Sequence, residues 1–203
     1  MPTLLYIHGF LSSPKSAKAQ STQAWLQYHR PRWQYQCPFL SSYPAEAKAT
    51  LDGLITQLDD DQVYLLGSSL GGFWATYLTE RYGFKSVLVN PAVNPQQRFI
   101  NLVGEPLNNY HTGEPFMLRS SDIDDLIACA PDRLSNLDLY WLMVQTGDET
   151  LDYRDAVSKY QGCRQTVEAG GDHSFVGFDS WLNEIVDFFE TPSHILQPAL
   201  QSN

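Results

Sequence analysis

Three side chains that are far apart in the sequence, Ser69, Asp148 and His173, have the types and the order needed for covalent acyl transfer. A serine hydroxyl is a poor nucleophile at neutral pH. It needs an imidazole to accept its proton and a carboxylate to hold that imidazole in the useful tautomer. Each of the three follows a short stretch that is predicted as a strand. We therefore predict Ser69 as a nucleophile, His173 as its general base and Asp148 as the acid that orients the base.

Ser69 is the serine of a G-x-S-x-G pattern, with Gly67 two residues before it and Gly71 two residues after it. The run 63–66 is apolar and predicts a strand, and residues 70–82 repeat apolar side chains with helical spacing. A strand that turns sharply into a helix lifts the serine hydroxyl above the sheet edge, and the flanking glycines avoid collisions in the tight turn. The pattern and its context together predict a nucleophile rather than a chance glycine turn.

Chain order separates His173 from the other histidines. In folds with this kind of serine turn, the acid and then the histidine follow later strands than the serine does. His173 comes directly after a predicted strand at 164–168 and a Gly-Gly turn. The remaining histidines end a strand before the serine, end a helix, or lie in an insertion and in the tail: His8, His29, His111 and His194.

Asp148 is the first carboxylate after the predicted strand 139–146, where the chain order requires an acid. Glu149, Asp152 and Asp172 are the competing carboxylates. Asp152 fits better as the N-cap of the next helix. The choice between Asp148 and Asp152 as the acid stays open at this point.

The transition state of acyl transfer carries negative charge on the carbonyl oxygen, which backbone N–H groups can stabilise. Leu70, the residue after the nucleophile, is one predicted donor. The second donor is expected from the loop after the first strand, where Gly9 allows the backbone to turn the next N–H inward. We predict that this donor is Phe10, with Leu11 as the second choice.

Predicted strands and helices alternate along most of the chain, which is typical of a parallel sheet with helices on both faces. We expect a doubly wound α/β sheet of six mainly parallel strands in the order 2-1-3-4-5-6. The predicted strands are residues 3–8, 33–37, 63–66, 86–89, 139–146 and 164–168, and the predicted helices are residues 15–29, 44–58, 70–82, 153–160 and 178–189.

The alternation is interrupted after the fourth strand, where residues 91–136 contain several prolines and one predicted helix at 122–129. Long insertions in compact domains are often lids or binding loops. Its aromatic residues Phe99, Tyr110 and Phe116 could line an acyl pocket or form a small core of the insertion itself. We predict one domain over residues 1–190, with a lid-like insertion at 91–136 and a loosely held tail at 191–203.

Composition narrows the function classes. The 203-residue chain is 43% hydrophobic and carries a formal net charge of −10, which argues against a nucleic-acid surface. Its three cysteines lie far apart and suggest neither disulfides nor a zinc site, so we expect no metal and no cofactor. No apolar run is long enough to span a bilayer, and the chain starts without the features of a signal peptide. We expect a cytoplasmic protein; the oligomeric state stays open.

Longer motifs of this chain resemble the bacterial YqiA-type esterases of the α/β-hydrolase superfamily. The resemblance implies a compact three-layer α/β-hydrolase fold and hydrolysis of carboxylic esters or acyl thioesters, with Ser69, Asp148 and His173 at the catalytic positions. The motifs that carry it are HGFLSSPKSAKA, LLGSSLGGFWATYL, VNPAV, YHTGEPF, QTGDETLDYR, CRQTVEAGGDHSF and VDFF.

The sequence therefore predicts a serine esterase or thioesterase that acts on a small acyl ester or thioester through an acyl-enzyme on Ser69. Two other functions are compatible with the same fold. One is a hydrolase or lyase of carbon–carbon bonds, because such enzymes share the serine turn. The other is a binding protein that keeps the fold without catalysis.

Overall fold

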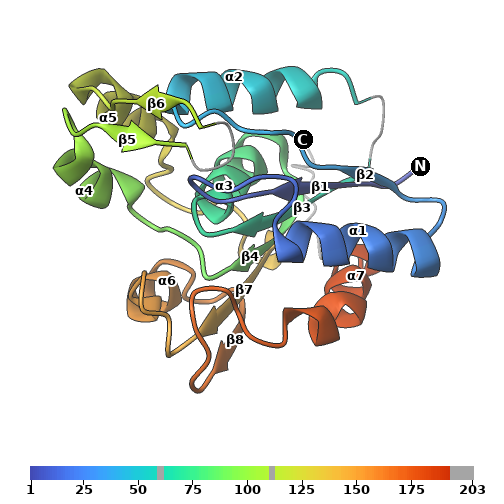
Figure 1. Cartoon of the computed structure of the whole chain (residues 1–203). Coiled ribbons are helices and arrows are strands. Elements are labelled where there is room, and N and C mark those ends of the chain that lie inside the picture. The colour runs from blue at the N-terminus through green and yellow to red at the C-terminus, as the bar shows by residue number, and fades with distance from the viewer. Residues whose placement is uncertain (59–61, 110–112, 193–203) are drawn as a thin grey trace, which may run out of the picture.

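The computed structural model describes residues 1–58, 62–109 and 113–192 (Figure 1). Tyr110, His111, His194 and most of the predicted tail lie outside these residues. The centre of the molecule is a six-stranded sheet, and each predicted strand is present with boundaries close to those expected. Its strands are β1 (Thr3–Ile7), β2 (Gln34–Gln36), β3 (Val63–Ser68), β4 (Lys85–Val89), β7 (Tyr140–Gln145) and β8 (Arg164–Glu168).

The strand order is β2-β1-β3-β4-β7-β8, and every neighbouring pair is parallel. This is the predicted order once the two short strands outside the main sheet are set aside. In the register of β1 against β3, Ile7 pairs with Gly67, so the end of β1 lies beside the serine turn. Because all strands run the same way, the loops after β1, β3, β4, β7 and β8 meet at one edge of the sheet.

Helices cover both faces of the sheet and make it the middle of three layers (Figure 1). One face packs against α1 (Ala17–His29) and α7 (Leu182–Glu190). On the other face lie α2 (Pro44–Ile55), α3 (Leu70–Tyr82) and α6 (Tyr153–Lys159), and α5 (Ser120–Cys129) packs against α2. Trp74 of α3 and Trp141 of β7 are fully buried, one on each side. The predicted three-layer α/β architecture with a parallel six-stranded sheet is confirmed.

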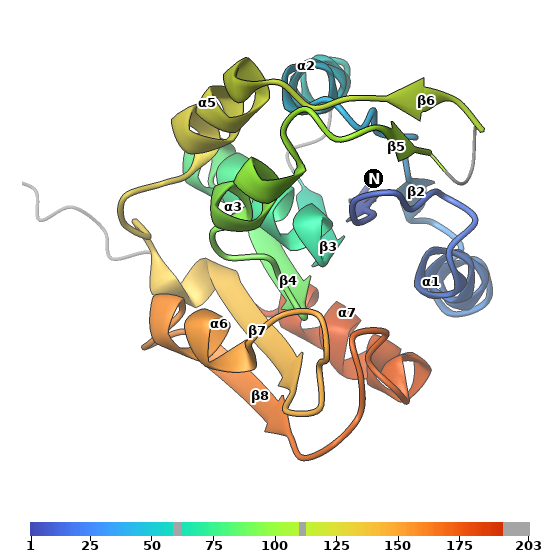
Figure 2. The same ribbon diagram turned by 60° about the vertical axis from the view of Figure 1, so that its left-hand side comes forward.

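The insertion after β4 contains more structure than its sequence predicted. Besides the expected helix α5 it forms α4 (Pro95–Phe99), a 3₁₀ turn η1 (Ile100–Leu102) and a small hairpin of β5 (Leu107–Asn108) and β6 (Pro115–Phe116). Figures 1 and 2 both show α5 and the hairpin of β5 and β6 beside α2. Elements this short are below the length at which hydrophobic periodicity can be read.

Ser69 joins β3 to α3 with backbone angles that residues other than glycine rarely adopt, φ 57° and ψ −124°. A Cβ atom on Gly67 would lie 2.3 Å from the carbonyl oxygen of Gly71. A Cβ atom on Gly71 would lie 1.9 Å from the carbonyl oxygen of Ile7 at the end of β1. Both neighbours are main-chain atoms that cannot rotate away. The two glycines are therefore required because three stretches of backbone touch at this turn.

We predict that Gly71→Ala lowers the free energy of unfolding by about 3 kcal/mol, because the new methyl group overlaps the main chain of β1. Gly53→Ala in α2 is the matched control, since a Cβ atom there meets nothing within 4 Å. It should raise stability by about 0.5 to 1 kcal/mol through helix propensity. Urea unfolding curves of both variants check this, and a Gly71→Ala protein as stable as the wild type would contradict it.

Candidate active site

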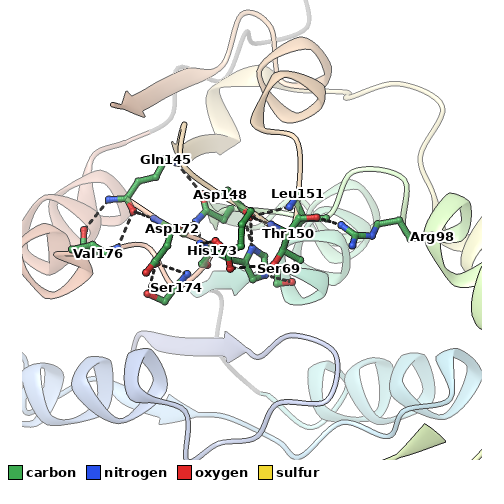
Figure 3. A network of polar contacts seen from close by, with 12 residues as sticks. Ser69, Arg98, Gln145, Asp148, Thr150, Leu151, Asp172, His173, Ser174 and Val176 are labelled. Carbon is green, nitrogen blue, oxygen red and sulfur yellow. Dashed lines mark hydrogen bonds and ion pairs between the residues drawn. The ribbon is translucent and has the colours of Figure 1, made fainter. Parts of the chain in front are cut away.

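The structure brings the three predicted residues together from the loops after β3, β7 and β8 (Figure 3). The Oγ atom of Ser69 lies 3.0 Å from Nε2 of His173. On the other side of the ring, Nδ1 of His173 lies 2.8 Å from Oδ2 and 3.0 Å from Oδ1 of Asp148. An ionised carboxylate can only accept, so Nδ1 carries the ring proton and Nε2 is left as the acceptor for the serine hydroxyl.

Asp148 is suited to remain ionised although its side chain is only 2% exposed. Burial alone would raise its pKa. The hydrogen bond from His173 and those from the backbone N–H groups of Leu151 and Thr150 outweigh burial and hold the pKa of Asp148 below its ordinary value. Both backbone groups donate to Oδ1 over 2.8 Å. The turn after β7 therefore fixes the carboxylate that contacts His173.

The competing carboxylate Asp152 has a different environment. It is the N-cap of α6, where its side chain accepts from the N–H of Arg154 over 3.0 Å, as predicted for a capping residue. The Arg154 guanidinium also pairs with it at 2.5 Å, and these contacts lower the pKa of Asp152 to about 2. Asp152 is engaged with Arg154, whereas Asp148 contacts the histidine.

The loop after β1 lies directly against the serine, as expected of a loop that supplies a backbone donor. A Cβ atom on Gly9 would be 3.0 Å from Cβ and 3.5 Å from Oγ of Ser69. Nε2 of His8 accepts the N–H of Leu40 over 3.0 Å, so its Nδ1 carries the proton and donates to the carbonyl of Gly9 over 2.9 Å. The C=O and N–H of a trans peptide point in opposite directions. His8 therefore fixes the direction of the Phe10 N–H through the Gly9 carbonyl.

A cleft of about 740 Å³ opens onto Ser69 and His173. The insertion supplies much of its wall. The guanidinium of Arg98 in α4 donates to the carbonyl of Thr150, in the loop that carries Asp148 (Figure 3). Phe99 lines the cleft and also packs on the ring of Phe10 at a centroid distance of 4.6 Å. It thus takes part both in the pocket and in the hydrophobic core that the insertion shares with the sheet, α2 and α3. The apolar lining comprises Phe10, Leu70, Val93, Phe99, Leu102 and Leu151.

Gln145, the last residue of β7, holds the histidine loop and was not identified from the sequence. Its Oε1 accepts the N–H groups of Asp172 over 3.2 Å and Val176 over 2.8 Å, and its Nε2 donates to the carbonyl of Val176 over 2.8 Å (Figure 3). A Cβ atom on Gly171 would be 1.9 Å from that Oε1. The sequence shows only a polar residue at the end of an otherwise apolar strand, which does not identify the partners of its side chain.

Among residues 1–58, 62–109 and 113–192, no three or more histidine, cysteine, aspartate or glutamate side chains form a cluster that could bind a metal ion. No helix there combines the length and the apolar character that a membrane crossing requires.

Solved structures with the same architecture are similar over almost the whole chain. Mouse alpha/beta hydrolase domain-containing protein 10 has a TM-score of 0.69 at 13% identity, covering 92% of this chain and 90% of that chain. Est1E from Butyrivibrio proteoclasticus with ferulic acid bound has a TM-score of 0.68 at 13% identity, covering 93% and 88%. Tomato methylketone synthase I, an H243A variant complexed with beta-ketoheptanoate, has a TM-score of 0.66 at 10% identity, covering 93% and 97%. At such identities the similarity establishes the α/β-hydrolase fold alone.

Curated relatives match over shorter stretches. A UPF0227 protein of Shewanella sediminis is 35% identical over 52 residues, which are 26% of this chain and 29% of that protein. A UPF0227 protein of Pectobacterium atrosepticum is 38% identical over 60 residues, or 28% of this chain and 31% of that protein. The matched segment thus spans less than a third of either relative. A family model described as "Uncharacterised protein family (UPF0227)" matches residues 3–190, so the chain belongs to this family, in agreement with the YqiA-type resemblance of its motifs.

Proposed function

We propose that the protein is a serine hydrolase that cleaves carboxylic esters or acyl thioesters through an acyl-enzyme on Ser69. The observation that carries this proposal is the continuous contact from the Ser69 hydroxyl through His173 to the Asp148 carboxylate, with separations of 3.0 Å and 2.8 Å. This arrangement is the one that turns a serine hydroxyl into a nucleophile.

In the first half of the reaction, Oγ of Ser69 attacks the carbonyl carbon of the substrate while its proton passes to Nε2 of His173. The electron pair of the C=O bond moves to the carbonyl oxygen. When the tetrahedral intermediate collapses, the bond to the leaving oxygen or sulfur breaks and the leaving group takes the proton from Nε2. Asp148 stays ionised and stabilises the imidazolium. The product of this half is an ester of Ser69.

In the second half, water attacks the acyl-enzyme while Nε2 of His173 accepts its proton, and Ser69 recovers that proton as the acid leaves. Both tetrahedral intermediates carry an oxyanion. We assign the N–H groups of Leu70 and Phe10 to it. Leu70 opens α3, where the first N–H groups of a helix have no intrahelical partner. The close approach of Gly9 to Ser69 supports Phe10, the next residue of that loop, as the second donor.

The proposed substrate is a small acyl ester or thioester whose acyl group occupies the apolar part of the cleft. Phe10, Phe99 and Leu151 support this, because they bring apolar surface to the vicinity of the serine. We also propose that the insertion 91–136 acts as the cover of the cleft, which is supported by the lining residues of the segment 91–102.

We predict that the wild-type protein hydrolyses p-nitrophenyl acyl esters and that Ser69→Ala lowers kcat by at least about 10³-fold, because the nucleophile is lost. A fluorophosphonate probe should label the wild type and leave Ser69→Ala unlabelled. The rate is followed by release of p-nitrophenol over a series of acyl chain lengths, and labelling by mass spectrometry of the intact protein.

These measurements also separate the alternatives. A wild type that hydrolyses no ester above the Ser69→Ala control, yet cleaves a diketone-type substrate, would favour a carbon–carbon bond hydrolase or lyase. A folded wild type that the probe does not label would favour a binding protein.

We predict that Asp148→Asn lowers kcat by on the order of 10³- to 10⁴-fold, because the amide no longer holds His173 in the tautomer that accepts a proton. Asp152→Asn is the matched control. Asparagine is an equally good N-cap, so this variant should stay within about threefold of the wild type. Steady-state kinetics on one ester decide between the two acids; the reverse pattern would assign the role to Asp152.

A further inference from the structure

The main chain of Ser69 is hydrogen-bonded at both of its polar groups to the segment that leaves β4. Its N–H donates to the carbonyl of Val89 over 3.1 Å, and its carbonyl accepts the N–H of Ala92 over 2.9 Å. Asn90 lies between these two residues, and its own N–H donates to the carbonyl of Met143 on β7 over 2.8 Å. The segment 89–92 therefore stabilises the strained backbone of the serine and is itself fixed to the sheet.

The side chain of Asn90 reaches from this segment to the loop that carries the histidine. Its Nδ2 donates to the carbonyl of Asp172 over 3.0 Å and to the carbonyl of His173 over 3.2 Å. Its Oδ1 accepts the N–H of Gln145 over 3.0 Å. Asn90 itself is only 2% exposed, and leaving a buried amide without its partners is costly.

Several requirements at this position are met together by asparagine. Asn90 has a left-handed φ of 42°, a conformation that asparagine tolerates better than most residues with a side chain. Its amide supplies two donors toward two carbonyl oxygens and one acceptor toward an N–H group. Aspartate would place a second oxygen against those carbonyls, and glycine would keep the backbone conformation but lose all of the side-chain bonds.

We infer that Asn90 is a positioning residue that sets the distance between the hydroxyl of Ser69 and the imidazole of His173. Its flanking residues bind the main chain of the serine, and its amide binds the main chain of the histidine. Hydrogen bonds to their main chains therefore connect Ser69 and His173 through Asn90 and its neighbours, in addition to the direct contact between the two side chains. Pro91 and Ala92 line the cleft, whereas Asn90 faces the protein interior and acts on catalysis through His173. This inference rests on the proposed function.

The test is a double-mutant cycle with Asn90→Gly and His173→Ala, measured as kcat and KM on one p-nitrophenyl ester. Asn90→Gly in the wild type should lower kcat on the order of 10²-fold with KM within about threefold, because a misplaced base slows the chemical step rather than binding. With His173→Ala already present, Asn90→Gly should change the residual rate by less than about twofold. A residue that acts through the histidine has nothing left to position.

A fall on the order of 10²-fold in both backgrounds would overturn the inference, since Asn90 would then support the serine or the fold and not the histidine. Equal activity of Asn90→Gly and the wild type would overturn it as well. If the wild type shows no hydrolysis that depends on Ser69, the proposed function itself has failed, and this outcome is distinct from both.

Tyr35→Phe is the matched control for loss of a partly buried hydrogen bond. The Tyr35 hydroxyl donates to the carbonyl of Ala19 over 2.8 Å at the β2 edge of the sheet, and neither residue lines the cleft. This variant should lower the unfolding midpoint in urea but leave kcat unchanged. Asn90→Asp is run through the same cycle and decides the outcome if Asn90→Gly does not fold. If neither variant folds, Asn90 is a requirement of the fold and the inference is wrong.

Discussion

The close approach of three stretches of main chain at the carboxyl edge of the sheet is the constraint on which the site depends. Gly67 and Gly71 lack side chains because the ends of β3 and β1 and the start of α3 touch there. Gly9 lies against Ser69 for the same reason. These contacts force the serine into a left-handed conformation, lift its hydroxyl out of the sheet and place the first N–H groups of α3 beside it. The geometry of Ser69 follows from packing of the backbone and not from its side chain.

The parallel sheet brings together residues that are distant in the sequence. Ser69 and His173 are 104 positions apart in the chain, yet each follows a strand of the same sheet and so emerges at the same edge. Asp148 follows β7, which is the neighbour of β8, the strand that precedes the histidine. Adjacent strands place the carboxylate beside the imidazole, while β4 separates β7 from the serine strand. That spacing leaves room at the edge for the ring of His173 between its two partners.

This regularity explains how much of the structure the sequence could predict. Strand ends and chain order were enough to predict Ser69 and His173. They favoured Asp148 as the acid without excluding Asp152, and the sheet order followed from the alternation of strands and helices. Asn90 and Gln145 were not predicted as site residues, because their importance lies in hydrogen bonds to the backbone of a loop distant in sequence, and no residue type or spacing encodes such a pairing. The hairpin of β5 and β6 was missed for a different reason, since two residues per strand form no detectable pattern.

The loop 172–176 has no regular secondary structure, yet each of its N–H groups donates to a protein acceptor. Side chains from other parts of the fold bind the main chain of this loop. Gln145 at the end of β7 accepts from its N–H groups, and Asn90 after β4 and Lys18 in α1 donate to its carbonyls. A loop bound in this way does not need substrate to order it, because its backbone already has the partners that a helix or a strand would supply. The imidazole is therefore held in contact with Ser69 before any ligand arrives. In the acyl transfer that we propose, an arrangement fixed in advance avoids the reorganisation that would otherwise add to the barrier.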